Sequence, residues 1–142
     1  MRKSIFILLI FIITIVIVIC ACSMFSNRTK YALEIINIDD ILTIEITKDG
    51  NNIIITSTDK IADISNTILG VKRVTKEASI SDYPANIENV ITINITSKTE
   101  EKETLYLYKK NNKYFIEKPY NGIYQISNDE YDIIINYVEK DI

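Results

Sequence analysis

The sequence predicts an α+β domain with a mainly antiparallel sheet of five or six strands and two helices packed on one face. Segments of alternating polarity recur along the chain, joined by short polar turns, and two amphipathic segments begin with helix-capping residues. Successive strands with separate helices are typical of α+β proteins. A length of 142 residues fits one such domain, and an apolar fraction of 47% argues against a disordered chain.

The N-terminal residues 1–21 have the layout of an export signal. Two cations, Arg2 and Lys3, precede an apolar run over residues 5–19. A spanning helix needs about 20 apolar residues, so an uncleaved anchor over residues 5–24 is the alternative.

The end of the apolar run resembles the lipobox of bacterial lipoproteins. That motif has an aliphatic residue three positions before the modified cysteine and a small residue directly before it, as Ile19 and Ala21 stand before Cys22. Cys20 fits poorly as the acceptor, because the bulky Ile19 precedes it directly. The resemblance implies that residues 1–21 are removed and that the lipid, with its palmitate-type acyl chains, is attached at Cys22.

Cleavage would leave a lipidated cysteine and short tether, residues 22–30, before a single extracytoplasmic domain over residues 31–142. Two or more acyl chains hold a protein durably on a membrane, since each buried methylene contributes about 0.8 kcal/mol. A tether this short extends to roughly 30 Å. We therefore expect the domain at the extracytoplasmic face of the cell membrane.

Charge and composition exclude several partners. Loss of the two N-terminal cations leaves 14 basic against 19 acidic side chains, a net charge near −5. Nucleic-acid binders show a basic stripe, and the pairs at residues 72–73 and 109–110 are too small to form one. Without histidine, and with Cys20 removed and Cys22 lipidated, the domain offers no disulfide and no Cys/His metal site, and we expect no cofactor.

The first part of the domain predicts a hairpin and a helix. Residues 32–38 are expected to form an edge strand, residues 41–48 alternate as a half-buried strand, and residues 53–58 return after a turn at 49–52. A helix then starts at Ser57 or Thr58 and ends at Gly70, with a stripe of Ile61, Ile64, Ile68 and Leu69.

The middle of the domain contains the longest irregular segment. Residues 71–75 are expected to form a short strand, and residues 76–88 show no periodicity. Pro84 excludes a central strand there, and loops of this length are often functional or disordered. Alternation resumes over residues 89–97 and 104–109.

The last part predicts a meander and a closing helix. A two-residue turn at 111–112 leads to a strand at 113–118, and the turn at 119–122 leads to a short strand ending at Ile126. Residues 127–130 have the S-x-x-E form of a capping box, which predicts a helix to about Lys140.

Candidate catalytic residues are few. Without histidine, a general base would have to be a carboxylate, a lysine or a tyrosine. A small hydrolase using a loop serine, Ser79 or Ser81, or a carboxylate pair is therefore an alternative only. Serines beside Asp82 and Pro84 ordinarily make turn hydrogen bonds.

Tyrosine is the one unusual enrichment. Tyr106 and Tyr108 are expected on the sheet face opposite Leu105 and Leu107. Tyrosine combines a large rigid ring with a polar tip, which suits recognition, although cross-strand packing is the commoner use. Six of the nine tyrosines gather in the loop, the meander and the closing turn: Tyr83, Tyr106, Tyr108, Tyr114, Tyr120 and Tyr124.

Four motifs stand in the second half of the chain: SISDYP at 79–84, TLYLYKK at 104–110, KYFIEKPYNGIY at 113–124 and SNDEYDIII at 127–135. On these motifs the chain, over roughly residues 31–138, resembles a family of small lipoprotein domains of unknown function from low-GC Gram-positive bacteria. The resemblance implies a lipid-anchored extracytoplasmic location and no assigned activity. It singles out Ser81, Asp82, Tyr83, Pro84, Glu117, Pro119, Tyr120, Gly122 and Tyr124.

We therefore expect a non-catalytic binding module. Its partner would be a peptide, a cell-wall fragment or a membrane protein, engaged where the 76–88 loop meets the turn at Tyr120. The alternative from another class is a structural or immunity-type surface protein, which would expose a large apolar patch. The candidate binding edge comprises Ser81, Asp82, Tyr83, Pro84, Glu117, Tyr120 and Tyr124.

Overall fold

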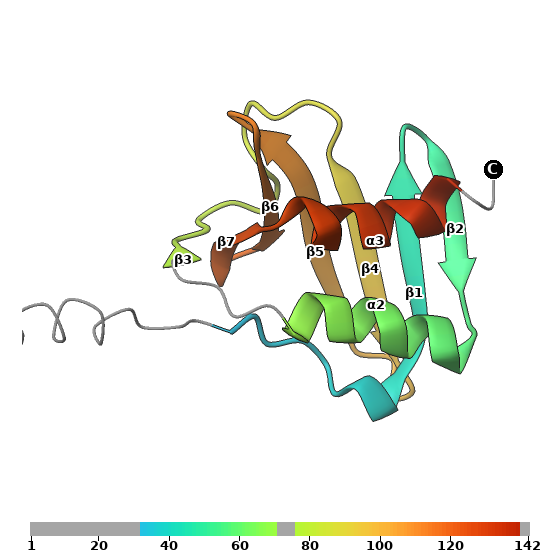
Figure 1. The fold of residues 1–142 in the computed structure, drawn as a ribbon. Coiled ribbons are helices and arrows are strands. Elements are labelled where there is room, and N and C mark those ends of the chain that lie inside the picture. Colours follow the sequence, from blue (N-terminus) through green and yellow to red (C-terminus); the bar gives the residue numbers. More distant parts are fainter. Residues whose placement is uncertain (1–31, 71–75, 140–142) are drawn as a thin grey trace, which may run out of the picture. The chain divides into compact units, whose positions relative to one another are not determined.

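A computed structural model describes residues 32–70 and 76–139 (Figure 1). In this part of the chain one antiparallel sheet has the strand order β2-β1-β4-β5-β6-β7-β3, and two helices lie on one side of it. The predicted α+β class is confirmed, with β3 adding two residues to six longer strands. The elements are η1 (Ile38–Asp40), β1 (Ile41–Lys48), β2 (Asn51–Ile55), α2 (Thr58–Gly70), β3 (Lys76–Glu77), β4 (Ile91–Ser97), β5 (Lys102–Lys110), β6 (Lys113–Lys118), β7 (Gly122–Ile126) and α3 (Asn128–Glu139).

Isoleucine builds the core between the sheet and the helices. In β4 the side chains of Ile91, Ile93 and Ile95 are buried and alternate with half-buried polar residues. The predicted stripe on α2 meets them: Ile61, Ile64 and Ile68 are buried, and Leu69 is half-buried. We refer to the sheet face toward the helices as the inner face and to the opposite one as the outer face.

Two hairpin turns follow from residues that tolerate a left-handed backbone. Asn111 and Asn112 have φ angles of 50° and 59°, which confirms the two-residue turn between β5 and β6. Asp49 and Gly50, with φ of 51° and 82°, form the turn between β1 and β2. Strand pairing therefore begins at Asn51, and the longer predicted turn at residues 49–52 is wrong because two residues of positive φ suffice.

The capping box of α3 is confirmed. The Ser127 backbone N–H donates to Glu130 Oε2 at 2.7 Å, and the Glu130 backbone N–H donates to Ser127 Oγ at 3.2 Å. The helix then buries Ile134, Ile135 and Val138.

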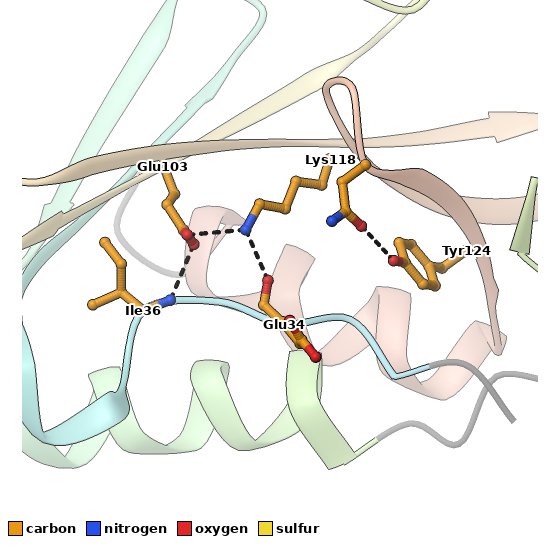
Figure 2. Close-up of polar contacts among 6 residues, drawn as sticks. Glu34, Ile36, Glu103, Lys118 and Tyr124 are labelled. Atoms are coloured by element: carbon orange, nitrogen blue, oxygen red, sulfur yellow. Dashed lines mark hydrogen bonds and ion pairs between the residues drawn. The ribbon is translucent and has the colours of Figure 1, made fainter. Parts of the chain in front are cut away.

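The expected edge strand before β1 is wrong. This segment, residues 32–37, forms no strand, bends at Ile36 and leads into the single turn η1. Side chains satisfy its backbone instead: the Ile36 N–H donates to Glu103 Oε2 at 3.0 Å, and Lys118 Nζ donates to the Glu34 carbonyl at 2.9 Å (Figure 2). The fully buried Leu33 anchors the segment in the core. The apolar residues of this segment pack on the core, and side chains supply the backbone hydrogen bonds that a neighbouring strand would otherwise make.

Several expectations lie outside the described residues. They are the export signal at 1–21, the lipid attachment at Cys22, the tether at 22–30, the strand at 71–75 and the last residues of the closing helix. Within the described ranges, no helix has the length and apolar character needed to cross a membrane.

Candidate functional site

The irregular loop after β3 is fastened to the outer face of the sheet by Glu117 of β6. Ser79 Oγ in the loop donates to Glu117 Oε1 at 2.6 Å, and Tyr108 OH on β5 donates to Glu117 Oε2 at 2.9 Å. All three side chains are buried. Since each carboxylate oxygen has a donor, the buried charge is paired with hydrogen bonds and joins the loop to two strands.

The Tyr108 hydroxyl is held in its neutral form. Its ring stacks on Phe115 with centroids 5.8 Å apart. Burial, and next the hydrogen bond to Glu117, raise the pKa of Tyr108 well above its ordinary value. The protonated phenol is therefore part of the folded structure.

Alkaline pH is expected to weaken the fold through Tyr108. Because the folded-state pKa lies above the unfolded value, the unfolded chain loses this proton first, and the free energy of unfolding falls as the pH rises beyond about 10. In Tyr108→Phe this decline should be less steep between about pH 10 and 12. Urea unfolding at a series of pH values measures it. Equal slopes in the two proteins would show that Tyr108 does not contribute.

Aromatic rings continue from the loop onto the outer face. Tyr83 in the loop and Tyr106 on β5 meet edge to face, with ring centroids 5.0 Å apart and an interplanar angle of 69°. Tyr106 is half-buried, whereas Tyr83 is 51% exposed. Burial, followed by electrostatic interactions with Tyr83 and Asp82, raises the pKa of Tyr106. Tyr83 therefore keeps about half of its surface open to solvent beside this contact.

The turn between β6 and β7 carries a further tyrosine, Tyr120. The Asn121 N–H donates to the Lys118 carbonyl at 3.0 Å, with Pro119 at the second turn position and Tyr120 at the third. Tyr120 has a φ of 56°, in the left-handed region where type II turns favour glycine or asparagine. Its ring is 68% exposed, and a hydrogen bond to Asp82 raises the pKa of its hydroxyl. The loop and the turn therefore touch.

Beside this contact lies a groove of about 560 Å³, which we call the tyrosine groove. It forms where β5 continues past β6: the last pair between these strands is Tyr106 with Glu117, so Lys102 to Thr104 have no pairing residue in β6. The lining residues are Asp82, Lys102, Glu103, Thr104, Tyr106, Lys118, Pro119 and Tyr120.

A smaller pocket of about 260 Å³ lies under the loop. Ser79, Ser81, Tyr108 and Glu117 are among its lining residues. The serine that faces a carboxylate there is Ser79, through its 2.6 Å bond to Glu117.

The structure separates the residues of the candidate binding edge. Asp82, Tyr83 and Tyr120 are exposed, and Asp82 and Tyr120 lie close together at the groove. Ser81 is half-buried, Pro84 and Glu117 are buried, and Tyr124 lies on the inner face with its hydroxyl donating to Asn121 Oδ1 at 2.6 Å (Figure 2). Residues that the sequence did not place at the edge also line the groove: Lys102, Glu103, Thr104, Tyr106 and Lys118.

The described residues contain no group of three or more His, Cys, Asp or Glu side chains placed to hold a metal ion.

The model of the DUF5301 family, described as "Domain of unknown function (DUF5300)", matches residues 29–125. No curated protein and no solved structure was found to be similar to the chain. The matched region contains both tyrosine-bearing segments of the groove and ends before α3.

Proposed function

The chain belongs to the DUF5301 family, and we propose that it is a membrane-anchored extracytoplasmic lipoprotein whose domain is a non-catalytic binding module. The sequence supports the location, because a charged start, a short apolar run and a lipobox-like end precede Cys22. The tyrosine groove supports the binding role and is the surface that we assign to it.

The observation that carries the binding role is the conformation of Tyr120. A left-handed backbone costs a non-glycine residue about 1–2 kcal/mol. The Tyr120 ring is 68% exposed, so burial of the ring returns little of that cost. Stability alone would favour glycine or asparagine at this position. A strained residue that projects an aromatic ring into solvent beside a groove indicates function.

Replacing Tyr120 with glycine is expected to abolish binding while leaving the fold intact. Glycine adopts a positive φ without strain, which offsets the greater freedom it gives the unfolded chain, so the free energy of unfolding should stay within about 0.5 kcal/mol of wild type. Photo-crosslinking on intact cells, with the probe introduced at Ile80, would measure association of the full chain; Ile80 is 83% exposed in the same loop.

The matched control is Ile133→Ala, which removes an exposed side chain from α3. We expect crosslinked adducts in the wild type and in the control. We expect none in Tyr120→Gly or in the charge reversal Asp82→Lys. An adduct pattern identical in all four proteins would contradict the proposed binding surface.

A second candidate function is hydrolysis, favoured by the 2.6 Å contact of Ser79 Oγ with Glu117 beside the smaller pocket. Two features of the pair favour a structural role, in which it holds the loop on the sheet, over catalysis. Glu117 also accepts the Tyr108 hydroxyl, and its side chain is only 4% exposed. Breaking the pair should therefore reduce stability, and no turnover should depend on it.

A further inference from the structure

We infer that the tyrosine groove binds an uncharged oligosaccharide, an inference that rests on the proposed binding function and names its ligand class. The first support is the chemistry of the lining. Among the residues that the structure describes, the lining consists of four charged residues, Thr104, two tyrosines and Pro119, and none of these has an aliphatic side chain. Peptide and lipid partners are anchored by apolar groups buried in apolar pockets, and this groove offers none.

The charges of the groove are balanced. The lining residues include two lysines, Lys102 and Lys118, and two acidic residues, Asp82 and Glu103. Lys118 Nζ lies 2.9 Å from Glu103 Oε1, and this ion pair points to the inner face, where it also binds the backbone of Glu34 and Ile36 (Figure 2). Because Lys118 and Glu103 neutralise each other, one cation, Lys102, and one anion, Asp82, remain for a ligand, and a charged ligand of either sign would meet one like charge. A neutral ligand avoids both penalties and still finds donors and acceptors.

The exposed groups match the two kinds of surface on a sugar ring. A pyranose has a face of C–H groups, which stacks on aromatic rings, and a rim of hydroxyl groups. Tyr120 is 68% exposed and Tyr83 is 51% exposed, so both offer aromatic surface to a ligand near Asp82. The hydroxyl groups on the rim of the sugar can form hydrogen bonds with the Asp82 carboxylate and with the backbone of β5 between Lys102 and Thr104, which has no partner in β6.

The groove also has a suitable size and form. The groove is widely open to solvent, and its volume of about 560 Å³ lies in the range of small-molecule sites. Tyr83 lies outside its lining but contacts Tyr106 inside it, so a ligand longer than one ring can reach both exposed tyrosines. This arrangement favours a chain of several sugars over a monosaccharide.

The test is binding of the tetramer of N-acetylglucosamine, an uncharged chain of the acetylated sugar found in bacterial wall glycan. The full chain is kept in a detergent without a sugar headgroup, so that the detergent cannot compete. Because the protein has no tryptophan, its tyrosine fluorescence can be followed during the titration, and the Tyr120 variants assign the change to the groove. We expect saturable binding with a Kd of about 1 mM or tighter.

Three variants assign the binding to the groove. Tyr120→Gly should weaken the tetramer about tenfold or more, because the stacking face is lost, and Asp82→Asn should weaken it by a similar factor. Tyr120→Phe keeps the ring and should bind within about threefold of wild type. Ile133→Ala, far along the chain on α3, should bind as wild type does.

The outcomes separate the ligand class from the proposed function. Absence of saturable binding up to about 10 mM, or equal affinity in wild type and Tyr120→Gly, would overturn the oligosaccharide inference. If cell-surface crosslinks still depend on Tyr120, the groove binds another class of ligand and the proposed function stands. If neither the tetramer nor the crosslinks depend on Tyr120, both proposals are overturned.

Discussion

Replacing Glu117 with alanine is expected to lower the free energy of unfolding by about 3 kcal/mol. The substitution removes the acceptor of both Ser79 Oγ and Tyr108 OH, and it leaves the two hydroxyls buried without a partner. Each such orphaned donor costs about 1–3 kcal/mol, and the missing side chain leaves a cavity. Part of this destabilisation is offset, because the variant no longer has to bury a carboxylate away from water.

Urea unfolding followed by circular dichroism measures the effect. Glu117→Gln retains one carbonyl acceptor and should lose about half as much, whereas Glu88→Ala, an exposed residue at the end of the same loop, should change stability by less than about 0.5 kcal/mol. Ser79→Ala and Glu117→Ala should also be non-additive, because they remove the same bond. A stable Glu117→Ala protein that instead loses turnover of an ester probe would favour the hydrolase.

Replacing Cys22 with serine is expected to abolish incorporation of labelled palmitate completely. The diacylglyceryl group of a lipoprotein is attached through a thioether, which a hydroxyl cannot form. Cys20→Ser is the matched control, and it should incorporate label as wild type does, since the small Ala21 precedes Cys22 and the bulky Ile19 precedes Cys20. Label that depends on Cys20, or label in neither wild type nor control, would contradict the assignment of Cys22.

The elements of the fold were predictable where local chemistry decides them. Alternation identifies the buried Ile93 and Ile95 of β4, positive-φ residues identify the turn at 111–112, and Ser127 with Glu130 identifies the start of α3. The segment before β1 was not predictable in this way. Its isoleucines favour a strand locally, but its backbone is bonded by Glu103 and Lys118, which are distant in sequence.

The candidate site was predictable only in part. Alternation tells on which face of the sheet a residue lies, but it gives neither the register between strands nor the loops that lie over that face. It places Tyr106 on the outer face, yet only the pairing of β5 with β6 shows that Lys102 to Thr104 border a groove. Glu117 becomes buried because the loop covers it. Tyr124 could have been excluded from the edge, since it lies two residues before the buried Ile126 and therefore on the same, inner face of the strand.

The most direct test of the proposed lipoprotein is the intact mass of the protein extracted from membranes. We predict a chain that begins at Cys22, lacks residues 1–21 and carries the additional mass of a diacylglyceryl group. An unmodified mass of 16.3 kDa, corresponding to all 142 residues, would instead establish an uncleaved anchor and contradict lipid attachment.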